Sequence, residues 1–535
     1  MWRRAPGADD GRVTEIIAGP SLSPLEFLVV ASAAALVPAR WLPPAARSRL
    51  TVVAGALLVL SALLLGLTGV RWQLLPVLAG AGCALPFACS PLLRRRAGPP
   101  AWRARWWLAL PGSAACLGLI AAGPVAAWAF PVPVFPEPTG GFAVGTRVVQ
   151  WTDPQRPETF TADPDDRRTV VVQLWYPAQR SPDGAERAPY LGRTAQEART
   201  VSEALARGVG LPGFLVDGVP RARSRAVFDA PVADAGGRFP VVLFSPGSSG
   251  VRTQNTAWAE ELASHGYVVA ALDHPYDSAA VVLSDGRTIT TATRSSGDAA
   301  EDAKLAAGWT AIRAADLGFV LTRLTGLTGQ GGQGGLTGQG GRGKQSGQSV
   351  QVAQAGQAVQ GPDGVADPLT GRLDTGRVAV AGHSLGGAAA LQAARQDHRF
   401  AAVVDLDGFP HGPASPALDR PALALTQEAT AGTDPRYLPR LTEALDANTA
   451  TSYRLTVPGA AHLAFTDGPL YLPPVPTIVG SLGRTRSPRV VAGATLAFLD
   501  AVLRNGWDGR GGPGDPADAL RAYGELGTHR PGGGR

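Results

Sequence analysis

Long apolar runs dominate the first quarter of the chain. Residues 50–70, 72–93 and 106–130 form runs of 21, 22 and 25 mostly apolar residues. A helix needs about 20 such residues to cross the hydrocarbon core of a bilayer, so each run is long enough. A weaker run of 13 residues at 27–39 either adds a fourth transmembrane helix or forms a re-entrant or interfacial helix. The sequence predicts an all-α transmembrane domain of about four helices over residues 1–135.

The pattern changes after the proline-rich residues 131–138, where short β-branched and apolar runs alternate with helical patterns. The predicted strands are residues 169–176, 240–245, 267–273, 377–382, 401–406, 422–426 and 452–457. The predicted helices are residues 254–264, 298–324, 385–396, 435–448 and 490–503. Several strands are almost continuously apolar, as strands buried on both faces are. This alternation predicts an α/β fold with a mostly parallel sheet over residues 136–507.

Two segments show neither pattern. Residues 325–361 consist largely of Gly and Gln, and Gly is again frequent in residues 508–535. Such compositions bury too little apolar surface to order the backbone. We therefore expect a disordered insert at 325–361, within the α/β domain, and a flexible C-terminal tail at 508–535.

Charge is distributed as unevenly as hydropathy. The chain carries a net charge of +6, and only 17% of its residues are charged. Residues 1–136 contain twelve basic and four acidic residues, a balance of +8, whereas the remainder contains 37 and 39, a balance of −2. The large C-terminal part therefore lacks the strong basic excess of a nucleic-acid-binding domain, and no nucleic acid is expected as a partner.

Arginine placement predicts the topology of the transmembrane domain. With four spans, eight arginines fall in the first and third loops, and only Arg71 falls in the middle loop. Positively charged loops remain in the cytoplasm. The sequence thus predicts a multi-pass protein of the cell membrane whose residues after 130 lie on the extracytoplasmic side, whether or not residues 27–39 cross the bilayer. No span contains an ionisable residue of the kind that marks a transport path, which disfavours a transporter.

One motif carries recognisable chemistry. Residues 377–391 read Arg-Val-Ala-Val-Ala-Gly-His-Ser-Leu-Gly-Gly-Ala-Ala-Ala-Leu and contain the pattern G-x-S-x-G at Gly382, Ser384 and Gly386. A strand pattern precedes the motif and a helix pattern follows it, which is the context of a nucleophile elbow. Such a turn exposes the serine Oγ at the N-terminus of the helix. Ser384 is the predicted nucleophile, and Gly382 and Gly386 are the elbow glycines; the alternative is a glycine-rich turn with an idle serine.

The elbow requires an acid and then a histidine further along the chain. His462 follows a late predicted strand and is the expected general base, with His411 as the weaker alternative. Asp405 and Asp407 both lie at the end of the strand predicted at 401–406. Asp407 directly precedes the glycine of the turn and is favoured as the acid, but Asp405 remains open. The acid would fix the tautomer of the histidine.

A second glycine-rich turn supplies a candidate oxyanion hole. Residues 239–250 read Phe-Pro-Val-Val-Leu-Phe-Ser-Pro-Gly-Ser-Ser-Gly, a strand followed by a tight turn. Backbone N–H groups at such turns stabilise the negative charge that develops on an ester oxygen. We assign this role to the N–H groups of Ser248 and Leu385; the alternative for Ser248 is an ordinary strand-to-helix turn. No cofactor or metal is expected, because the three cysteines lie in apolar runs without metal-type spacing.

Six segments of the body, in chain order, point to a known family. They read Val-Gln-Leu-Trp-Tyr-Pro-Ala from residue 172, Leu-Phe-Ser-Pro-Gly-Ser from 243, Leu-Ala-Ser-His-Gly-Tyr-Val-Val-Ala-Ala-Leu-Asp-His from 262, Val-Ala-Gly-His-Ser-Leu-Gly-Gly from 380, Leu-Asp-Gly from 406 and Pro-Gly-Ala-Ala-His-Leu-Ala-Phe-Thr-Asp from 458. Together they resemble the platelet-activating factor acetylhydrolases of the plasma and intracellular type II kind, within the α/β-hydrolase superfamily. The resemblance covers residues 138–503.

The resemblance implies an α/β-hydrolase fold and metal-independent hydrolysis of short or oxidised sn-2 acyl esters of phospholipids. The spacing of Ser384, Asp407 and His462 is similar to that of the family's triad, which supports Asp407 as the acid. The transmembrane domain is similar to that of actinobacterial relatives. The sequence departs from the animal enzymes in two places: it has Ser-Pro-Gly at 245–247, where they have Ser-His-Gly, and it contains the Gly/Gln-rich insert.

The sequence therefore predicts a membrane-anchored serine esterase that acts on a lipid or small-molecule ester through a Ser-His-Asp acyl-enzyme mechanism. A general carboxylesterase or a polyester hydrolase of the cutinase kind uses the same elbow and is the first alternative. A non-catalytic receptor or scaffold on a hydrolase fold is the second, and a broken triad would be its signature. The segment Asp-His-Pro-Tyr-Asp-Ser from residue 273 is expected to shape the rim of the pocket. Nothing in the sequence indicates a protein partner.

Overall fold

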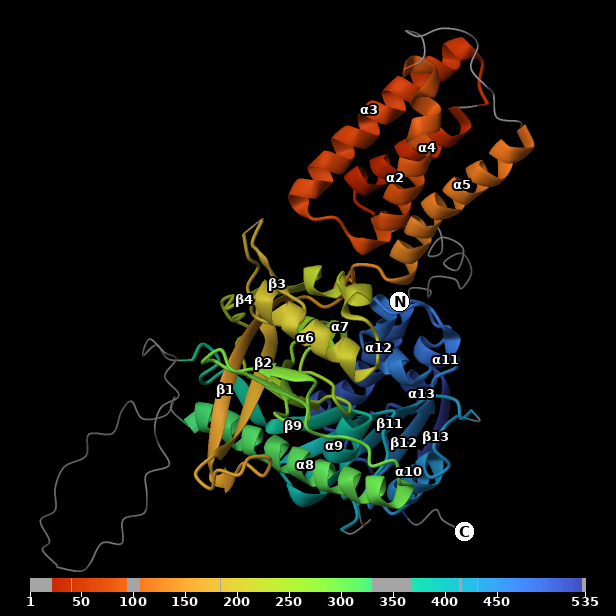
Figure 1. Ribbon diagram of the computed structural model, residues 1–535. Helices are drawn as coiled ribbons and strands as arrows, with labels where there is room; N and C mark the ends of the chain where they lie inside the picture. Colours follow the sequence, from red (N-terminus) through yellow and green to blue (C-terminus); the bar gives the residue numbers. More distant parts are fainter. Residues whose placement is uncertain are drawn as a thin grey trace, which may run out of the picture. The chain divides into compact units, whose positions relative to one another are not determined.

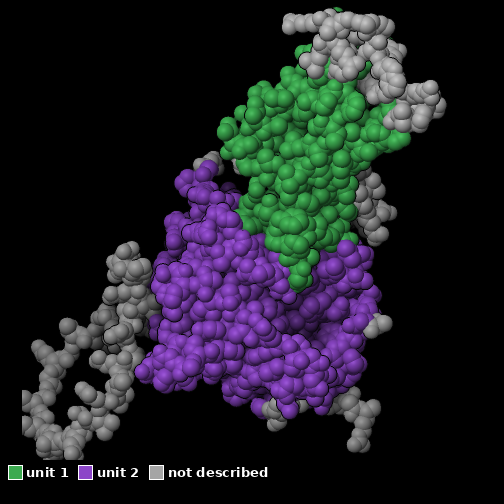
Figure 2. All heavy atoms as spheres, in the orientation of Figure 1, with its two compact units in different colours: residues 1–134, 209–222, 470–474 green, residues 135–208, 223–469, 475–535 purple. Residues whose placement is uncertain are grey.

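The computed structural model describes residues 22–39, 41–93, 106–182, 184–329, 367–412, 416–430 and 432–531. The chain divides into two compact units, which are coloured separately in Figure 2. The first unit contains Met1–Val134, Val209–Ala222 and Leu470–Pro474. The second unit contains Phe135–Gly208, Arg223–Pro469 and Val475–Arg535.

Apolar helices build the described part of the first unit. They are α2 (Pro24–Ala39), α3 (Pro44–Thr68), α4 (Leu75–Leu93) and α5 (Trp106–Ala129), with a short 3-10 turn at Trp72–Leu74 (Figure 1). Three stretches within these elements are long and apolar enough to cross a membrane, namely Ala46–Leu67, Trp72–Cys89 and Ala109–Ala129. α2 is shorter, with 16 residues. The helices match the apolar runs of the sequence, and the weak first run forms the short helix.

These helices are apolar on the outside as well as between one another. Leu63 is 65% exposed and Leu67 is 85% exposed, whereas Leu58 and Leu65 on the same helix are buried. A helix that is apolar on every side is typical of a membrane span. The outward leucines of α3 would be costly in water, and lipid would cover them.

The second unit is organised around one sheet of eleven strands. The order of the strands is β13-β12-β11-β10-β9-β5-β6-β2-β1-β4-β3. The strands are β1 (Ala143–Pro157), β2 (Arg167–Ala178), β3 (Arg187–Pro189), β4 (Arg223–Phe228), β5 (Phe239–Ser245), β6 (Val268–Asp273), β9 (Leu373–His383), β10 (Phe400–Leu406), β11 (Ala422–Thr426), β12 (Ser452–Thr456) and β13 (Glu525–His529). The six strands from β6 to β12 in this order are parallel, whereas β2 and β13 join the parallel block in antiparallel pairings. A separate two-stranded sheet pairs β7 (Ala280–Val282) with β8 (Thr288–Thr290).

The described part of the second unit contains eight α-helices, some of which cover the two faces of this sheet. They are α6 (Ala195–Gly208), α7 (Thr256–Ser264), α8 (Ala299–Gly329), α9 (Leu385–Gln396), α10 (Tyr437–Asp446), α11 (Pro476–Val479), α12 (Arg486–Leu499) and α13 (Ala517–Leu520) (Figure 1). Residues of α8, α9 and α10 share one buried apolar cluster with alternate positions of β5, and residues of α7 and α12 share the other. Val241 and Leu243 face the first cluster, whereas Val242 and Phe244 face the second, as the two-residue period of a strand requires. This arrangement is the α/β-hydrolase architecture that the sequence predicts.

The structure extends one predicted helix into the Gly/Gln-rich insert. α8 continues to Gly329, so residues 325–329 are helical and not disordered as expected. Leu327 is buried against the core, and its apolar contact extends the helix by more than a turn beyond Leu324. Residues 330–361, the rest of the predicted insert, lie outside the described residues.

The structure also gives the C-terminal segment a place in the sheet. Residues 525–529 form β13, which pairs antiparallel with β12 in the register Ser452↔His529 and Thr456↔Glu525. β12 would otherwise expose a row of unpaired backbone groups at the edge of the sheet, and β13 satisfies them. β13 is five residues long and Leu526 is its only residue that packs against the apolar core, so the glycine-rich composition of 508–535 concealed this strand.

Candidate active site

Ser384 lies on a strand-to-helix turn that strains its own backbone. β9 ends at His383, α9 begins at Leu385, and Ser384 between them has a φ of 55° and a ψ of −121°. A non-glycine residue in such a region costs about 1–3 kcal/mol and persists only where its surroundings enforce it. The N–H of Ser384 donates to the carbonyl oxygen of Leu406 at 2.9 Å, which ties the turn to the end of β10.

Close backbone contacts explain the two glycines of the turn. A Cβ on Gly382 would lie 2.1 Å from the carbonyl oxygen of Gly386, and a Cβ on Gly386 would lie 2.0 Å from the carbonyl oxygen of Ser245. No side chain fits at either position. The second contact also places the start of α9 directly against the end of β5, where the candidate oxyanion turn begins.

The structure brings His462 and Asp407 together, although 55 residues separate them in the chain. His462 Nδ1 lies 2.6 Å from Asp407 Oδ2, and the His462 side chain is 42% exposed whereas that of Asp407 is 1% exposed. Further donors hold the Asp407 carboxylate: Gln427 donates from its backbone N–H to Oδ1 at 2.8 Å and from Nε2 to Oδ2 at 2.9 Å, and the Tyr437 hydroxyl donates to Oδ1 at 2.6 Å. These donors fix the orientation of the buried carboxylate toward His462.

The imidazole of His383 links the serine turn to His462. The two histidine rings lie 4.6 Å apart, and His383 Nε2 donates to the backbone carbonyl oxygen of His462 at 3.1 Å. Ser384, the next residue, is therefore brought to the same end of the sheet as His462 and Asp407. In the described part of the chain, no hydrogen bond joins the Ser384 hydroxyl to His462; catalytic hydrogen bonds are often longer before substrate binds.

A buried arginine forms hydrogen bonds to the backbone of the turn that carries Ser248. Arg313 of α8 donates to the carbonyl oxygens of Pro246 and Gly247, the latter at 2.9 Å, and forms two hydrogen bonds of 2.6 and 2.8 Å with the carboxylate of Asp277. Because these two carbonyls face Arg313, the path of the turn is fixed on one side. Sequence reasoning missed Arg313, because nothing in the sequence distinguishes it from Lys304 and Arg323, the other basic residues of the same helix.

The segment from residue 273 supports this turn and does not merely line a rim. His274 is fully buried, with Nε2 2.9 Å from the Ser245 hydroxyl and Nδ1 2.8 Å from Asp316 Oδ2. Burial lowers the pKa of His274, and the hydrogen bond to Asp316 opposes this shift. Asp273 binds the buried Arg252, and Asp277 binds Arg313. These contacts anchor the end of β5 and the turn that follows it.

The alternative acid and the alternative base take other positions. Asp405 is 1% exposed, and its Oδ1 accepts the Gly408 N–H at 2.9 Å; its Oδ2 has no hydrogen-bond partner. Burial, together with the neighbouring Asp407, raises the pKa of Asp405 well above the ordinary range. The ring of His411 packs against that of Phe409, with 4.5 Å between the ring centres. Burial and nearby arginines lower the pKa of His411 to about 4. In this geometry Asp407, and not Asp405, is the partner of His462.

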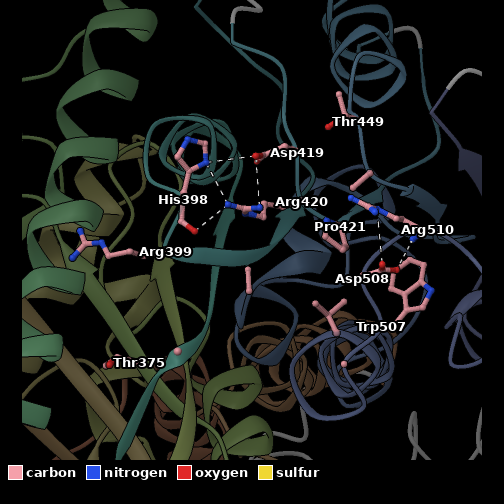
Figure 3. Close-up of a pocket in the computed structure, with 15 residues that line it drawn as sticks. Thr375, His398, Arg399, Asp419, Arg420, Pro421, Thr449, Trp507, Asp508 and Arg510 are labelled. Carbon is pink, nitrogen blue, oxygen red and sulfur yellow. Dashed lines mark hydrogen bonds and ion pairs between the residues drawn. The ribbon is translucent and has the colours of Figure 1, made fainter.

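A cavity of about 770 Å³ lies at the opposite end of the parallel strands. Its walls come from the segments that precede β10, β11 and β12, and Figure 3 shows Arg420 bridging His398 and Asp419 on one side. Ser384, Asp407 and His462 follow the carboxyl ends of the parallel strands, whereas this cavity lies at their amino ends. It therefore does not belong to the candidate active site.

The described residues contain no cluster of three His, Cys, Asp or Glu side chains that could hold a metal ion. Cys83, Cys89 and Cys116 are free thiols in the first unit.

Comparison with known proteins identifies the family. Residues 129–295 and 350–508, more than half of the chain, match the family described as platelet-activating factor acetylhydrolase, isoform II. The chain is 29% identical over 164 residues to a probable 1-alkyl-2-acetylglycerophosphocholine esterase of Arthroderma benhamiae, a match that covers 29% of this chain and 41% of that protein. The chain thus aligns with about two fifths of the length of this curated relative.

A solved structure agrees in fold. The chain is similar to a ferulic acid esterase from Streptomyces cinnamoneus, with a TM-score of 0.50 and 28% sequence identity over 71% of this chain and 96% of that one. Both named relatives are esterases. With the architecture and the serine turn described above, these matches show that the chain belongs to the platelet-activating factor acetylhydrolase isoform II family of carboxylic ester hydrolases.

Proposed function

We propose that this protein is a membrane-anchored serine esterase whose active site is formed by Ser384, His462 and Asp407. The observation that carries the proposal is the 2.6 Å contact between His462 Nδ1 and the buried carboxylate of Asp407, at the end of the sheet where the strained turn presents Ser384. Nucleophile, base and orienting acid occur in the chain order of an α/β hydrolase. A non-catalytic receptor or scaffold would have no need to preserve all three.

In the proposed mechanism, His462 acts first as a base and then as an acid. Its Nε2 takes the proton of the Ser384 hydroxyl as Oγ attacks the ester carbonyl, and Asp407 stabilises the resulting imidazolium. The N–H groups of Ser248 and Leu385 hold the oxyanion. The imidazolium returns its proton to the leaving alcohol, which departs as the acyl-enzyme forms. Water then attacks the acyl-enzyme by the same steps and releases the acid.

The proposed substrates are phospholipids with a short or oxidised sn-2 acyl group. The family description and the name of the Arthroderma relative, a probable 1-alkyl-2-acetylglycerophosphocholine esterase, support this class. The similarity to a ferulic acid esterase supports the alternative of a carboxylesterase with a wider range, including polyesters. A panel of short-acyl phospholipids, p-nitrophenyl esters, feruloyl esters and polyester films on one enzyme preparation distinguishes these possibilities by their relative kcat/KM values.

We further propose that residues 1–135 anchor the protein in the cell membrane and that the catalytic domain, residues 136–507, lies on the extracytoplasmic side with residues 508–535 at its end. Three stretches of sufficient length and apolarity support the anchor, and the arginine-rich loops support the orientation. Protease added to intact cells and to inverted vesicles tests the orientation, because cleavage of the α/β domain in intact cells is expected and cleavage only in inverted vesicles would contradict it.

The decisive experiment for the active site is Ser384→Ala with a fluorophosphonate probe. The probe phosphonylates an activated serine with loss of fluoride, so the wild-type protein is expected to be labelled and S384A is not. Ser284→Ala is the matched control, because Ser284 is an exposed serine in the turn between β7 and β8. Undiminished labelling of S384A would refute the assignment of the nucleophile.

A further inference from the structure

One side chain, Gln254, lies inside the turn that carries the proposed oxyanion donor. Its Oε1 accepts the N–H of Gly247 at 3.2 Å. Gly250, on the far side of the turn, approaches so closely that a Cβ there would lie 2.1 Å from the same oxygen. The turn closes on itself through a hydrogen bond of 2.9 Å from the Gly250 N–H to the Gly247 carbonyl oxygen. The Gln254 carboxamide therefore fills the turn and determines the direction of the backbone around Ser248.

The other end of the same carboxamide reaches the serine turn. Gln254 Nε2 lies 2.8 Å from His383 Nδ1. Since Oε1 accepts the Gly247 N–H, the amide group at Nε2 has only hydrogens to offer, and His383 Nδ1 must be the unprotonated, accepting nitrogen. The proton of the neutral ring is then on Nε2, which donates to the backbone carbonyl oxygen of His462 at 3.1 Å. A carbonyl oxygen only accepts, so both ends of the chain of hydrogen bonds require the same tautomer.

The surroundings of His383 suit this single neutral form. The residue is 2% exposed, and burial, with His462 beside it, holds its pKa well below the ordinary range. His462 is the titratable side chain that faces the ring, at 4.6 Å between ring centres. A cationic His383 would lose its hydrogen bond from Gln254 and would repel the protonated form of His462.

The residues at and just before the start of α7 form hydrogen bonds to residues 465–467, which follow His462 in the chain. The carbonyl oxygen of Gln254 accepts the N–H of Asp467 at 2.9 Å, and Asn255 Nδ2 donates to the carbonyl oxygen of Phe465 at 2.6 Å. The buried carboxylate of Asp467 in turn accepts the N–H groups of Thr256 and Ala257 at 2.7 and 3.2 Å. Gln254 is thus fixed at its backbone to the segment after His462, and at its side chain to the other two turns.

We propose that Gln254 and His383 are positioning residues for ester hydrolysis: their hydrogen bonds hold the oxyanion turn, the serine turn and the His462 segment in one fixed arrangement. The inference rests on the proposed roles of Ser384, His462 and Ser248. Neither residue exchanges a proton with substrate. Their contribution is to place the Ser248 N–H where the oxyanion forms, a contribution made in the transition state and not in the bound substrate.

The first test is Gln254→Met in the full-length protein, solubilised in detergent and assayed with p-nitrophenyl acetate. Methionine has a similar size but cannot bond to Gly247 or to His383. Loss of an oxyanion donor costs about 10²–10³ in rate, so a displaced donor is expected to lower kcat about 10- to 100-fold. KM is expected to change less than about threefold, because the donor acts mainly in the transition state. Gln196→Met, at an exposed position of α6, is the matched control and is expected to behave as wild type.

A second variant keeps the proposal testable if Q254M does not fold. The carboxylate of Gln254→Glu can still accept the Gly247 N–H, but it now requires a proton on His383 Nδ1. That proton is lost as pH rises, because the variant ring must be an imidazolium to donate to both the carboxylate and the His462 carbonyl oxygen. The kcat/KM of Q254E is therefore expected to fall with rising pH, along an alkaline limb that the wild type lacks.

The outcomes distinguish a wrong assignment of the catalytic site from a wrong assignment of the positioning residues. If S384A retains activity, the proposed catalytic site is wrong and the positioning role falls with it. If S384A is inactive but Q254M keeps kcat within about twofold of wild type, or Q254E has the wild-type pH profile, only the positioning role is overturned. A fall in kcat with unchanged KM in Q254M, or the new alkaline limb in Q254E, supports it.

Discussion

Replacing Asp407 by Asn tests the orienting acid most directly, because the structure leaves the new amide no acceptable orientation. At the Oδ2 position the amide nitrogen would face two donors, His462 Nδ1 and Gln427 Nε2. At the Oδ1 position it would face the backbone N–H of Gln427, which cannot turn away, and the Tyr437 hydroxyl, which can. Either orientation sets donor against donor, and the first also favours the wrong tautomer of His462.

The side chain of D407N would lose hydrogen bonds that the Asp407 carboxylate accepts, and it would disturb the tautomer of His462. A hydrogen bond to a charged group is worth about 1.5–3 kcal/mol, so the loss of one or two at Asp407 should lower the free energy of unfolding by about 2–4 kcal/mol. The wrong tautomer of the base should lower kcat about 10⁴-fold, as the same substitution does in a serine protease triad. That rate loss corresponds to about 5.5 kcal/mol of transition-state stabilisation.

Steady-state hydrolysis of p-nitrophenyl acetate measures the rate, and thermal unfolding followed by tryptophan fluorescence measures stability. Asp405→Asn is the matched control, two residues away. Burial and the charge of Asp407 raise the pKa of Asp405, so an uncharged amide resembles its native state and kcat/KM is expected to stay close to wild type. If D407N kept a tenth or more of wild-type activity, or D405N lost as much as D407N, the assignment of Asp407 would be refuted.

Three further predictions follow from particular contacts. Gly386→Ala should abolish activity and lower the free energy of unfolding by about 3 kcal/mol, because the new Cβ would lie 2.0 Å from the Ser245 carbonyl oxygen. Gly318→Ala in α8 is the control: its Cβ would have its nearest neighbour at 3.8 Å, so activity and unfolding should stay as in the wild type. Burial raises the pKa of Glu260 to about 7, above its value in the unfolded chain, so the folded state loses stability as pH rises from about 4.5 to 7, by about 3 kcal/mol. Glu260→Gln should flatten this dependence, and equal pH slopes for variant and wild type would contradict it. Deletion of residues 524–535 should lower Tm by about 2–4 °C for each kcal/mol lost with β13, whereas deletion of 532–535 should leave Tm unchanged.

The sequence by itself determined the features that arise from local patterns. The apolar runs correspond to the helices of the first unit, because apolar length is a property of consecutive residues. Continuous apolar runs predicted seven strands of the large sheet, namely β2, β5, β6, β9, β10, β11 and β12. The serine turn follows from the small residues Gly382 and Gly386, which a tight turn requires whatever surrounds it. The sign and distribution of charge could likewise be counted directly.

Only the tertiary structure decided what depends on contacts between distant residues. The sequence favoured Asp407 over Asp405 but left both open, and the contact that separates them is visible only in the structure, where His462, 55 residues away, lies beside Asp407. Gln254 and His383, 129 residues apart, carry no motif that announces their contact, and neither does the pairing of β13 with the exposed edge of β12. Hydrogen bonds of this kind depend on where the folded backbone places a donor and an acceptor. A single sequence records both partners but not the distance between them.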